Sequence, residues 1–448
     1  QFYQKDSGGN WSLNANHDIN SLTVFSVAMD GVNAIVGDQG NDTDANNTTT
    51  LTDAGAAFYY KLRWREQTSP LSTNNPSEWF FSKKITPNIR RTQDFFGRAV
   101  AINGNSSMVS AMFHDFDENE SNFLSESGAA YFFEGGNPGG ISDNLAIWLK
   151  ADVDVNTDAN SNAIQWQDQS ANLHIANGQN NPIKVDNAIN FNPAIRSPDD
   201  KTTIFLIDFN ALIGSDYTIL AIAKRNTNAN KNYFLGTTGS SLNRGLHLGY
   251  RNNTSLALAH FGNDLDLPVD EYDNPAIVPV LVTGTLDQTI GRTLRELKDG
   301  ILKSTSDTST APLVGNSSGT LNGVIGTGFD FDGFDGDIAE VIIYSSTLTN
   351  SELQKINSYL AIKYGFTLPN TSGGTNGDYI ASNGTTIFWD ASSNATYHNN
   401  IIALAKDDQS TLHQTKSKSV NTNSILTIEK VGGITNNRNA VVMGSTSK

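Results

Sequence analysis

The sequence of 448 residues contains no cysteine, which excludes a disulfide scaffold, a thiolate zinc ribbon and an iron–sulfur cluster. No apolar run approaches the roughly 18 residues of a membrane-spanning helix. Charged residues make up only 17% of the chain, the formal net charge is −16, and lysine and arginine are nowhere clustered. Nucleic acid and anionic membranes attract a basic surface. We therefore expect no nucleic acid as partner and no membrane insertion.

Signatures of catalysis are also missing. The seven histidines are scattered, with no His-Glu-x-x-His pair, and no phosphate-binding loop ends in Lys-Ser or Lys-Thr. The Glu-x-Asp-x-x-Glu strand pattern, which supplies the paired carboxylates of many sandwich glycosidases, is absent. We interpret the densest acidic cluster as a solvated loop leading into an edge strand; its members are Asp330, Asp332, Asp335, Asp337 and Glu340. The sequence therefore predicts no enzyme.

An internal repeat fills the first third of the chain. One copy begins at Phe25–Gly37 and the next at Phe96–Ala111, and each holds two short alternating strands joined by a turn that contains glycine. Each copy continues through a loop rich in Asp and Asn to a third strand, at Ala54–Tyr60 and Ser127–Phe133. Phe2–Lys5 has the character of the third strand of a preceding copy.

This pattern resembles the FG-GAP repeat, in which Phe-Gly, a valine run and Gly-Ala before an aromatic strand recur. The resemblance covers about residues 1–134 and departs from the family at Ser26, where glycine is usual. It implies blades of a β-propeller. Two copies and a fragment are fewer than the four to eight blades that close one. We therefore expect an incomplete propeller, and a chain cut from a longer protein.

A second unit follows the glycine-rich linker Glu134–Gly140. Trp148–Asp152 and Trp166–Ser170 resemble the opening of a concanavalin-like, laminin-G-type module, and Phe334–Tyr344 resembles its last strand. The resemblance covers about residues 141–366 and implies a jelly-roll β-sandwich. Further alternating segments predict strands at Tyr217–Lys224, Gly245–Tyr250, Leu256–Phe261 and Val278–Thr285.

One helix is predicted at the end of this unit, over Ser351–Tyr364. Thr349 and Glu352 have the spacing of a capping box, and Gly365 is a helix-stop residue. Residues 378–448 form a third, β-rich unit, which resembles the module that often follows the laminin-G-type unit. We expect it to be truncated. The predicted fold class is all-β: propeller-like blades, then a jelly-roll sandwich, then a small β-rich module.

Two acidic loops at equivalent points of the repeats are candidate calcium sites, because calcium binds several oxygen ligands in a loop. The first offers Asp38, Asn41, Asp42 and Asp44, and the second offers Asp115, Asp117, Asn119 and Asn122. The FG-GAP resemblance implies calcium as the cofactor there. Neither loop keeps the family's closing glycine, so a plain polar turn remains the alternative. A third loop with similar spacing holds Asp152, Asp154, Asn156 and Asp158.

Aromatic side chains that stack on sugars are the second kind of candidate site. Trp148 and Trp166 lie within apolar alternation, so we expect them in the core. Tyr233, Tyr250 and Tyr272 stand near loops rich in asparagine and are the candidates expected to be exposed. None of these positions identifies a ligand by itself.

The sequence as a whole predicts a non-catalytic segment of a large extracellular surface protein that serves adhesion or the assembly of a surface structure. The module resemblances imply the secreted surface adhesins of Bacteroidota and export by the type IX route. The expected partner is a glycan or protein on another surface, or copies of the chain itself. The alternative is a carbohydrate-binding lectin module of a polysaccharide-degrading enzyme. A hydrolase with an unusual carboxylate pair at Asp337 is a third hypothesis.

Overall fold

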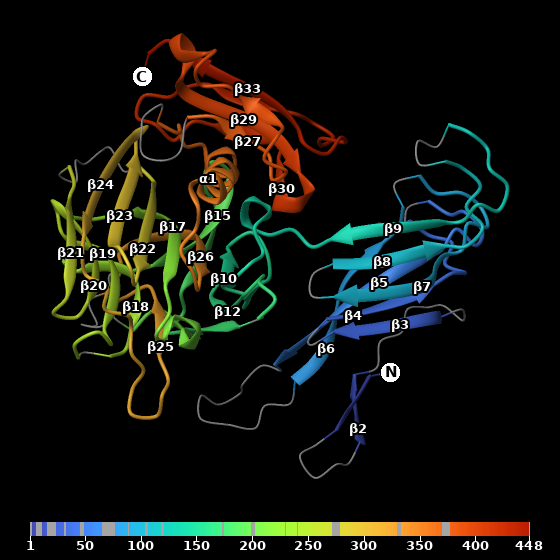
Figure 1. Cartoon of the computed structure of the whole chain (residues 1–448), viewed down its shortest axis with the longest axis horizontal. Coiled ribbons are helices and arrows are strands. Elements are labelled where there is room, and N and C mark those ends of the chain that lie inside the picture. The colour runs from blue at the N-terminus through green and yellow to red at the C-terminus, as the bar shows by residue number, and fades with distance from the viewer. Residues whose placement is uncertain are drawn as a thin grey trace. The chain divides into compact units, whose positions relative to one another are not determined.

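The chain divides into two compact units, Gln1–Gly135 and Gly136–Lys448 (Figure 1). The computed structural model describes residues 2–5, 11–15, 24–30, 33–44, 49–64, 77–87, 89–103, 106–117, 121–172, 174–198, 202–228, 230–239, 241–270, 278–328, 333–369 and 377–447. In that part of the chain, no helix combines the length and apolar character that crossing a bilayer requires.

The first unit consists of antiparallel sheets with the strand orders β1-β2, β3-β4-β5-β6 and β7-β8-β9. The strands are β1 (Phe2–Lys5), β2 (Trp11–Ala15), β3 (Val24–Asp30), β4 (Asn33–Asp38), β5 (Ala56–Trp64), β6 (Ser77–Ile85), β7 (Phe96–Asn103), β8 (Ser106–Ala111) and β9 (Ala129–Glu134). The three predicted strands of each repeat thus pair as one sheet.

The two repeat sheets pack face to face, and we call this contact the internal blade junction. Its buried core comprises Ile35, Ala57, Phe96, Val109 and Ala111. Glycine permits close contact between the two sheets, because a Cβ atom at Gly37 would lie 2.1 Å from the carbonyl oxygen of Gly97. Gly97 also has a φ of +92°, which disfavours other residues.

The second unit contains a β-sandwich of two antiparallel sheets. The first sheet runs in the order β14 (Ile183–Ile189), β15 (Asn192–Ser197), β26 (Gly336–Tyr344), β17 (Tyr217–Arg225), β22 (Val280–Asp287), β23 (Gly291–Lys298) and β24 (Ile301–Asp307), with β10 (Leu145–Lys150) also paired to β26. The second sheet runs in the order β11 (Val155–Thr157), β12 (Ala163–Gln167), β13 (Ile175–Gln179), β16 (Ile204–Asp208), β25 (Asn322–Ile325), β18 (Asn232–Thr237), β19 (Leu246–Asn252), β20 (Ser255–His260) and β21 (Asp264–Pro268). The predicted all-β sandwich is therefore confirmed.

Alternation along the strands places the main core between these two sheets. Trp166, Phe234 and Leu248 from the second sheet meet Ile219 and Val341 from the first, and all five are buried. Residues at the intervening positions of the second sheet consequently face outward. The outward positions of β18, β19 and β21 build the candidate site described below.

The predicted helix is confirmed as α1 (Asn350–Tyr364). The backbone N–H of Glu352 donates to Thr349 Oγ1 at 3.3 Å, while Glu352 Oε2 accepts from the backbone N–H of Thr349 at 2.8 Å. Gly365 ends the helix in the left-handed conformation, at φ +76°. The sequence signals at both helix ends therefore act as predicted.

A second core joins α1 to the outer face of the first sheet and to the C-terminal strands. Its members include Leu220, Ile342, Ile356, Tyr379 and Ile401. The remaining strands are β27 (Tyr379–Ile380), β28 (Ile387–Trp389), β29 (Asn399–Asp407), β30 (Leu412–Gln414), β31 (Lys416–Lys418), β32 (Thr427–Glu429) and β33 (Asn439–Ser445). Short 3₁₀ helices are η1 (Pro138–Gly140), η2 (Asn210–Leu212), η3 (Ala395–Tyr397) and η4 (Asp408–Ser410).

The expectation of a solvated acidic loop before β26 is wrong for its last two members. Asp337 is fully buried and accepts a bidentate pair of hydrogen bonds from Arg196, at 2.7 and 2.9 Å. Glu340 is 1% exposed, because α1 covers the outer face of β26. Asp330 and Asp332 lie outside the described residues.

Glu340 is the centre of a buried polar cluster between β26 and α1, which we call the Glu340 cluster. Its carboxylate accepts from Trp148 Nε1 at 2.7 Å, Tyr359 Oη at 2.8 Å, Lys363 Nζ at 2.9 Å and Tyr364 Oη at 2.8 Å. Burial alone would lower the pKa of Lys363, but the carboxylates of Glu340 and Asp152 outweigh it and raise that pKa. The ammonium group of Lys363 therefore keeps its charge inside the core.

Candidate functional site

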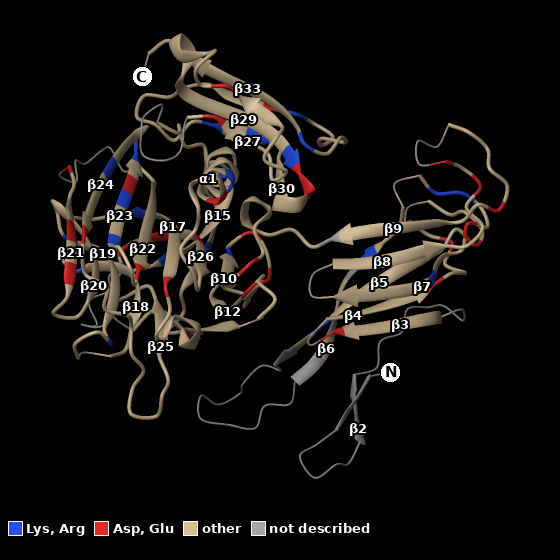
Figure 2. Cartoon of the chain, in the orientation of Figure 1, with Lys and Arg blue, Asp and Glu red and all other residues tan. Residues whose placement is uncertain are grey.

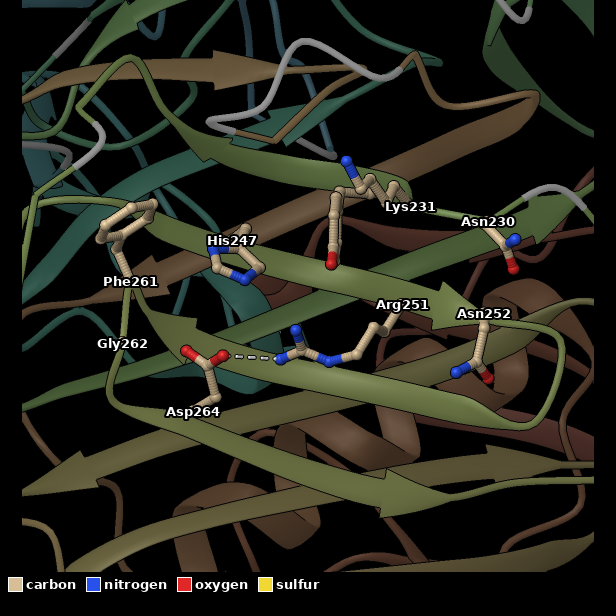
Figure 3. A pocket seen from close by; sticks show the side chains of 9 residues that line it. Asn230, Lys231, His247, Arg251, Asn252, Phe261, Gly262 and Asp264 are labelled. Atoms are coloured by element: carbon tan, nitrogen blue, oxygen red, sulfur yellow. Dashed lines mark hydrogen bonds and ion pairs between the residues drawn. The ribbon is translucent and has the colours of Figure 1, made fainter.

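An open pocket of about 500 Å³ lies on the outer side of the second sheet of the sandwich (Figure 3). It is formed by β18, β19, the start of β21 and the turns beside them. Its lining residues are Asn230, Lys231, Tyr233, His247, Arg251, Asn252, Phe261, Gly262 and Asp264. Aromatic, amide, cationic and carboxylate groups thus converge on one concavity.

Strand alternation explains which side chains reach this pocket. Leu246, Leu248 and Tyr250 of β19 belong to the core between the sheets. His247 and Arg251 therefore occupy outward positions on the same strand. The position between these two, Gly249, lies directly opposite Tyr233 on β18.

Tyr233 and His247 form the aromatic side of the pocket. Their ring centroids are 4.8 Å apart with an interplanar angle of 69°, an edge-to-face arrangement. Glycines make room for the tyrosine: a Cβ atom at Gly249 would lie 2.5 Å from Tyr233 Cα, and one at Gly328 would lie 2.8 Å from Tyr233 Cδ2. Both rings are almost fully buried, and burial raises the pKa of Tyr233 to about 12.

Arg251 forms the charged side of the pocket. Its Nη2 atom lies 3.0 Å from Asp264 Oδ2, and its Nε atom donates to Asp266 Oδ1 at 2.8 Å. Figure 2 shows the acidic residues on β21, and Figure 3 shows the Arg251–Asp264 pair. Burial would lower the pKa of Arg251, but the hydrogen bond to Asp266 contributes to raising it. Two carboxylates thus fix the guanidinium, which remains about one-third exposed.

Two turns complete the rim. Lys231 has a φ of +57° and donates its backbone N–H to the carbonyl oxygen of Arg251 at 2.8 Å. Phe261, in the turn after β20, has a φ of +50°. A non-glycine residue in the left-handed region costs free energy and is frequent at binding sites. The rim is therefore fixed by the fold in a defined shape.

One segment outside the pocket has the Gly-x-Ser-x-Gly spacing of a nucleophile elbow, Gly315–Gly319. Ser317 in its centre is exposed and belongs to a turn, which Asn316 Oδ1 stabilises by accepting from the backbone N–H of Ser318 at 2.8 Å. An elbow requires a strand-to-helix turn and a nearby base. Neither α1 nor a 3₁₀ helix follows this turn, since β25 does.

The first predicted calcium loop is closed by its own hydrogen bonds. Asp42 Oδ1 accepts from the backbone N–H of Asp53 at 2.7 Å, and Asp44 Oδ2 accepts from that of Thr49 at 3.2 Å. The ammonium group of Lys84 donates to Asn41 Oδ1 at 2.7 Å within the loop. Asp38 is buried and accepts from Asn41 Nδ2 at 3.1 Å. A protein cation therefore stands among the predicted ligands.

The second loop is closed by backbone hydrogen bonds in the same way, and no lysine donates to its described carboxylates, Asp115 and Asp117. Asp115 Oδ1 accepts from the backbone N–H of Glu126 at 2.6 Å. Hydrogen bonds from the backbone of Ser121 and the amide of Asn122 lower the pKa of Asp117 to about 2. Asn119 lies outside the described residues. Over the described ranges, no cluster of three His, Asp or Glu side chains has the geometry of a metal site.

Calcium binding remains a prediction, and we expect the two loops to differ in their ability to bind the ion. Because Lys84 occupies the first loop, we expect calcium uptake to depend on Asp117 and not on Asp44. Titration calorimetry should show calcium binding with a dissociation constant on the order of 10⁻⁴–10⁻³ M, as for many extracellular sites. Asp117→Asn should remove it, and Asp44→Asn should leave it unchanged. Equal loss in both variants would contradict this difference.

The third predicted metal loop is dispersed. Asp152 Oδ1 lies 2.9 Å from Lys363 Nζ in the Glu340 cluster. Asp154 Oδ2 accepts from Gln169 Nε2 at 3.3 Å, and Asp158 closes a turn by accepting from the backbone N–H of Asn160 at 2.8 Å. Asn156 donates to Gln165 Oε1 at 3.2 Å. These four residues therefore serve separate contacts.

The core positions of Trp148 and Trp166 are confirmed, since both are buried. The predicted exposure of Tyr233 and Tyr250 is wrong. Tyr250 points into the core, where its hydroxyl donates to Glu296 Oε1 at 2.7 Å. Tyr233 lines the pocket although little of it is exposed. Tyr272 lies outside the described residues.

Comparison with protein families matches two segments of the chain. Residues 79–133 match the FG-GAP repeat, in agreement with the motif in the sequence. Residues 352–446, from α1 to β33, match a domain of unknown function, DUF8202. A search of curated proteins found no match.

Solved structures with similarity to this chain include carbohydrate-binding β-domains. Domain 4 of AbnA, an extracellular arabinanase from Geobacillus stearothermophilus in complex with arabinotriose, has 14% identity and a TM-score of 0.33, covering 48% of this chain and 99% of that domain. The binding domain of botulinum neurotoxin DC in complex with SialylT has 16% identity and a TM-score of 0.32, and the match covers 48% of this chain and 50% of that chain. The CBM40 of Ruminococcus gnavus IT-sialidase has 16% identity and a TM-score of 0.28, and the match covers 36% of this chain and 94% of that chain.

Proposed function

We propose that this chain is a non-catalytic, carbohydrate-binding segment of an extracellular surface protein, and that the pocket on the sandwich holds the sugar. The surface protein would serve adhesion, and we expect its export by the type IX route. The observation that carries the proposal is the pocket itself, where an aromatic pair and a fixed arginine–carboxylate pair face one open concavity.

The chemistry of the lining suits a saccharide. Sugar hydroxyls both donate and accept hydrogen bonds, and sugar rings have apolar C–H faces. Arg251, Asn230 and Asn252 supply donors, Asp264 supplies acceptors, and Phe261 supplies an apolar edge. Because two carboxylates already balance the charge of Arg251, the site suits neutral hydroxyl groups better than a phosphate.

A glycan array probed with the whole chain tests this proposal. We expect binding to a defined set of glycans, and loss of at least tenfold in affinity for those glycans in Arg251→Met. Lys416→Met is the control, because it removes another partly exposed ion pair, with Glu429, in the C-terminal sheets. Absence of binding to every glycan, or an unchanged affinity in Arg251→Met, would overturn the assignment of the site.

A further inference from the structure

Three residues that line the pocket, Phe261, Gly262 and Asp264, belong to the turn between β20 and β21, which we call the rim hairpin (Figure 3). The backbone N–H of His260 donates to the carbonyl oxygen of Asn263 at 2.9 Å, which leaves two residues at the tip. Both are left-handed, with a φ of +50° at Phe261 and +75° at Gly262. Glycine adopts this conformation readily, but phenylalanine does so at a cost in free energy. The rim hairpin therefore needs support from the rest of the fold to hold its shape.

A buried arginine of the opposite sheet gives that support. Arg292 lies on β23, two positions before the core residue Leu294, so both side chains point into the space between the sheets. Arg292 is 1% exposed. Its Nη1 atom donates to the carbonyl oxygen of Asn263 at 2.7 Å, and its Nη2 atom donates to Asn263 Oδ1 at 3.2 Å. One guanidinium thus holds both the backbone and the side chain of the last residue of the turn.

The charge of Arg292 is balanced behind the rim hairpin by Asp307 at the end of β24. The Nε atom of Arg292 donates to Asp307 Oδ1 at 3.3 Å, and its Nη2 atom pairs with Asp307 Oδ2. Burial would raise the pKa of Asp307, but the hydrogen bond and the charge of Arg292 lower it. Well-packed apolar side chains often stabilise a core as much as a buried ion pair does. The distinctive contribution of the arginine is therefore its hold on Asn263.

The side chain of Asn263 is turned away from the pocket and is fully used inside the fold. Its Oδ1 atom also accepts from Ser309 Oγ at 3.0 Å, and its Nδ2 atom donates to Asn243 Oδ1 at 3.2 Å. The next residue along the chain, Asp264, lines the pocket and pairs with Arg251 at 3.0 Å. A shift of Asn263 would therefore move Asp264, and with it the guanidinium that faces the pocket.

We propose that Arg292 is a positioning residue of the sugar pocket, which sets the rim hairpin from the opposite sheet. This inference rests on the proposed function of the pocket. Arg292 does not line the pocket, so it acts on the sugar through Asn263, which places Phe261 and Asp264. The rim hairpin is thereby held in its binding shape before the sugar arrives, and such preorganisation raises affinity.

The affinity for a glycan identified on the array, measured by titration calorimetry on the whole chain, tests the inference. Arg292→Met should weaken binding roughly tenfold, the effect of one misplaced hydrogen bond to the sugar. Glu340→Ala is the control, because it removes a buried charge partner on the other side of the sandwich. Both variants are compared where circular dichroism shows them folded. A role in stability alone would leave the affinity of both unchanged, and this result would overturn the inference.

Arg292→Lys separates positioning from stability further. Lysine keeps a cation beside Asp307, but it lacks the planar fork with which arginine reaches both oxygens of Asn263. We expect a smaller loss of stability than in Arg292→Met and the same roughly tenfold loss of affinity. Native affinity in Arg292→Lys would contradict the inference, and this variant decides the question if Arg292→Met does not fold.

Two double variants show whether Arg292 acts through the rim hairpin. Figure 3 places Asn230 at the opposite end of the pocket from Phe261 and Gly262. Arg292→Met should weaken binding much less when Asp264→Ala is already present, whereas its effect should add to that of Asn230→Ala. Equal effects in the two backgrounds would overturn the inference while the proposed function stands. A native chain that binds no glycan would overturn the proposed function, and the inference with it.

Discussion

Replacement of Glu340 by alanine is expected to lower the free energy of unfolding by about 3–5 kcal/mol, the usual cost of removing one partner of a buried ion pair. The change leaves Trp148 Nε1 and the hydroxyls of Tyr359 and Tyr364 without their carboxylate acceptor. It also leaves the buried ammonium of Lys363 with Asp152 as its remaining carboxylate partner in the cluster. Urea denaturation of the whole chain measures the effect.

An exposed carboxylate provides the comparison. Glu429 pairs with Lys416 at 2.9 Å, and both side chains are about half exposed. Glu429→Ala should therefore cost less than about 1 kcal/mol. If Glu340→Ala lowers the free energy of unfolding no more than Glu429→Ala does, the Glu340 cluster does not hold α1 on the sandwich.

Replacement of Lys150 by methionine is expected to stabilise the protein near pH 7. Burial, followed by the positive charge of Lys363, lowers the pKa of Lys150 to about 8, although Asp152, Glu340 and Asp154 act in the opposite direction. The ordinary pKa of a lysine side chain is 10.5, so the lowered pKa corresponds to a penalty of about 3 kcal/mol for the charged form. Loss of the hydrogen bond to Thr411 Oγ1, at 2.8 Å, offsets about 1 kcal/mol of the gain.

The pH dependence of stability identifies this residue. Below pH 8, Lys150 is charged in both the folded and the unfolded chain, and the full penalty applies. Between pH 8 and 10.5 Lys150 binds its proton less in the folded chain than in the unfolded chain. The free energy of unfolding should therefore rise with pH in the native protein, and the methionine variant should lack this rise. Above pH 10 the buried Tyr359 and Tyr364, whose pKa values are raised, oppose the trend. Unfolding should therefore be compared at pH 7 and 9.5; a methionine variant less stable at pH 7 would contradict the account.

Local patterns predicted the elements that local chemistry determines. The capping box of Thr349 and Glu352 located the start of α1, and apolar alternation located β17, β19, β20 and β22. The repeat spacing located the strands of both blades. The capping box and the alternation depend on residues only a few positions apart, and the repeat is found by comparing two segments of the sequence, so no knowledge of tertiary packing was needed.

Features that depend on distant segments were not predicted. Glu340 lies in an acidic stretch of the sequence, and it is buried because α1 packs on the outer face of β26. Tyr233 was expected to be exposed, but Gly328 and His247 cover its ring. The pocket joins residues of β18, β19 and β21 with the turns beside them. Alternation on β19 could have indicated that His247 and Arg251 face outward, but not that Asp264 and Asp266 hold the arginine.

The measurement that tests the proposed function most directly is a crystal structure of the whole chain soaked with a glycan identified on the array. The account predicts sugar density in the pocket, with hydroxyl groups within hydrogen-bond distance of Arg251 and Asp264 and a ring face beside Phe261. Sugar density elsewhere on the sandwich, with this pocket empty, would contradict the account.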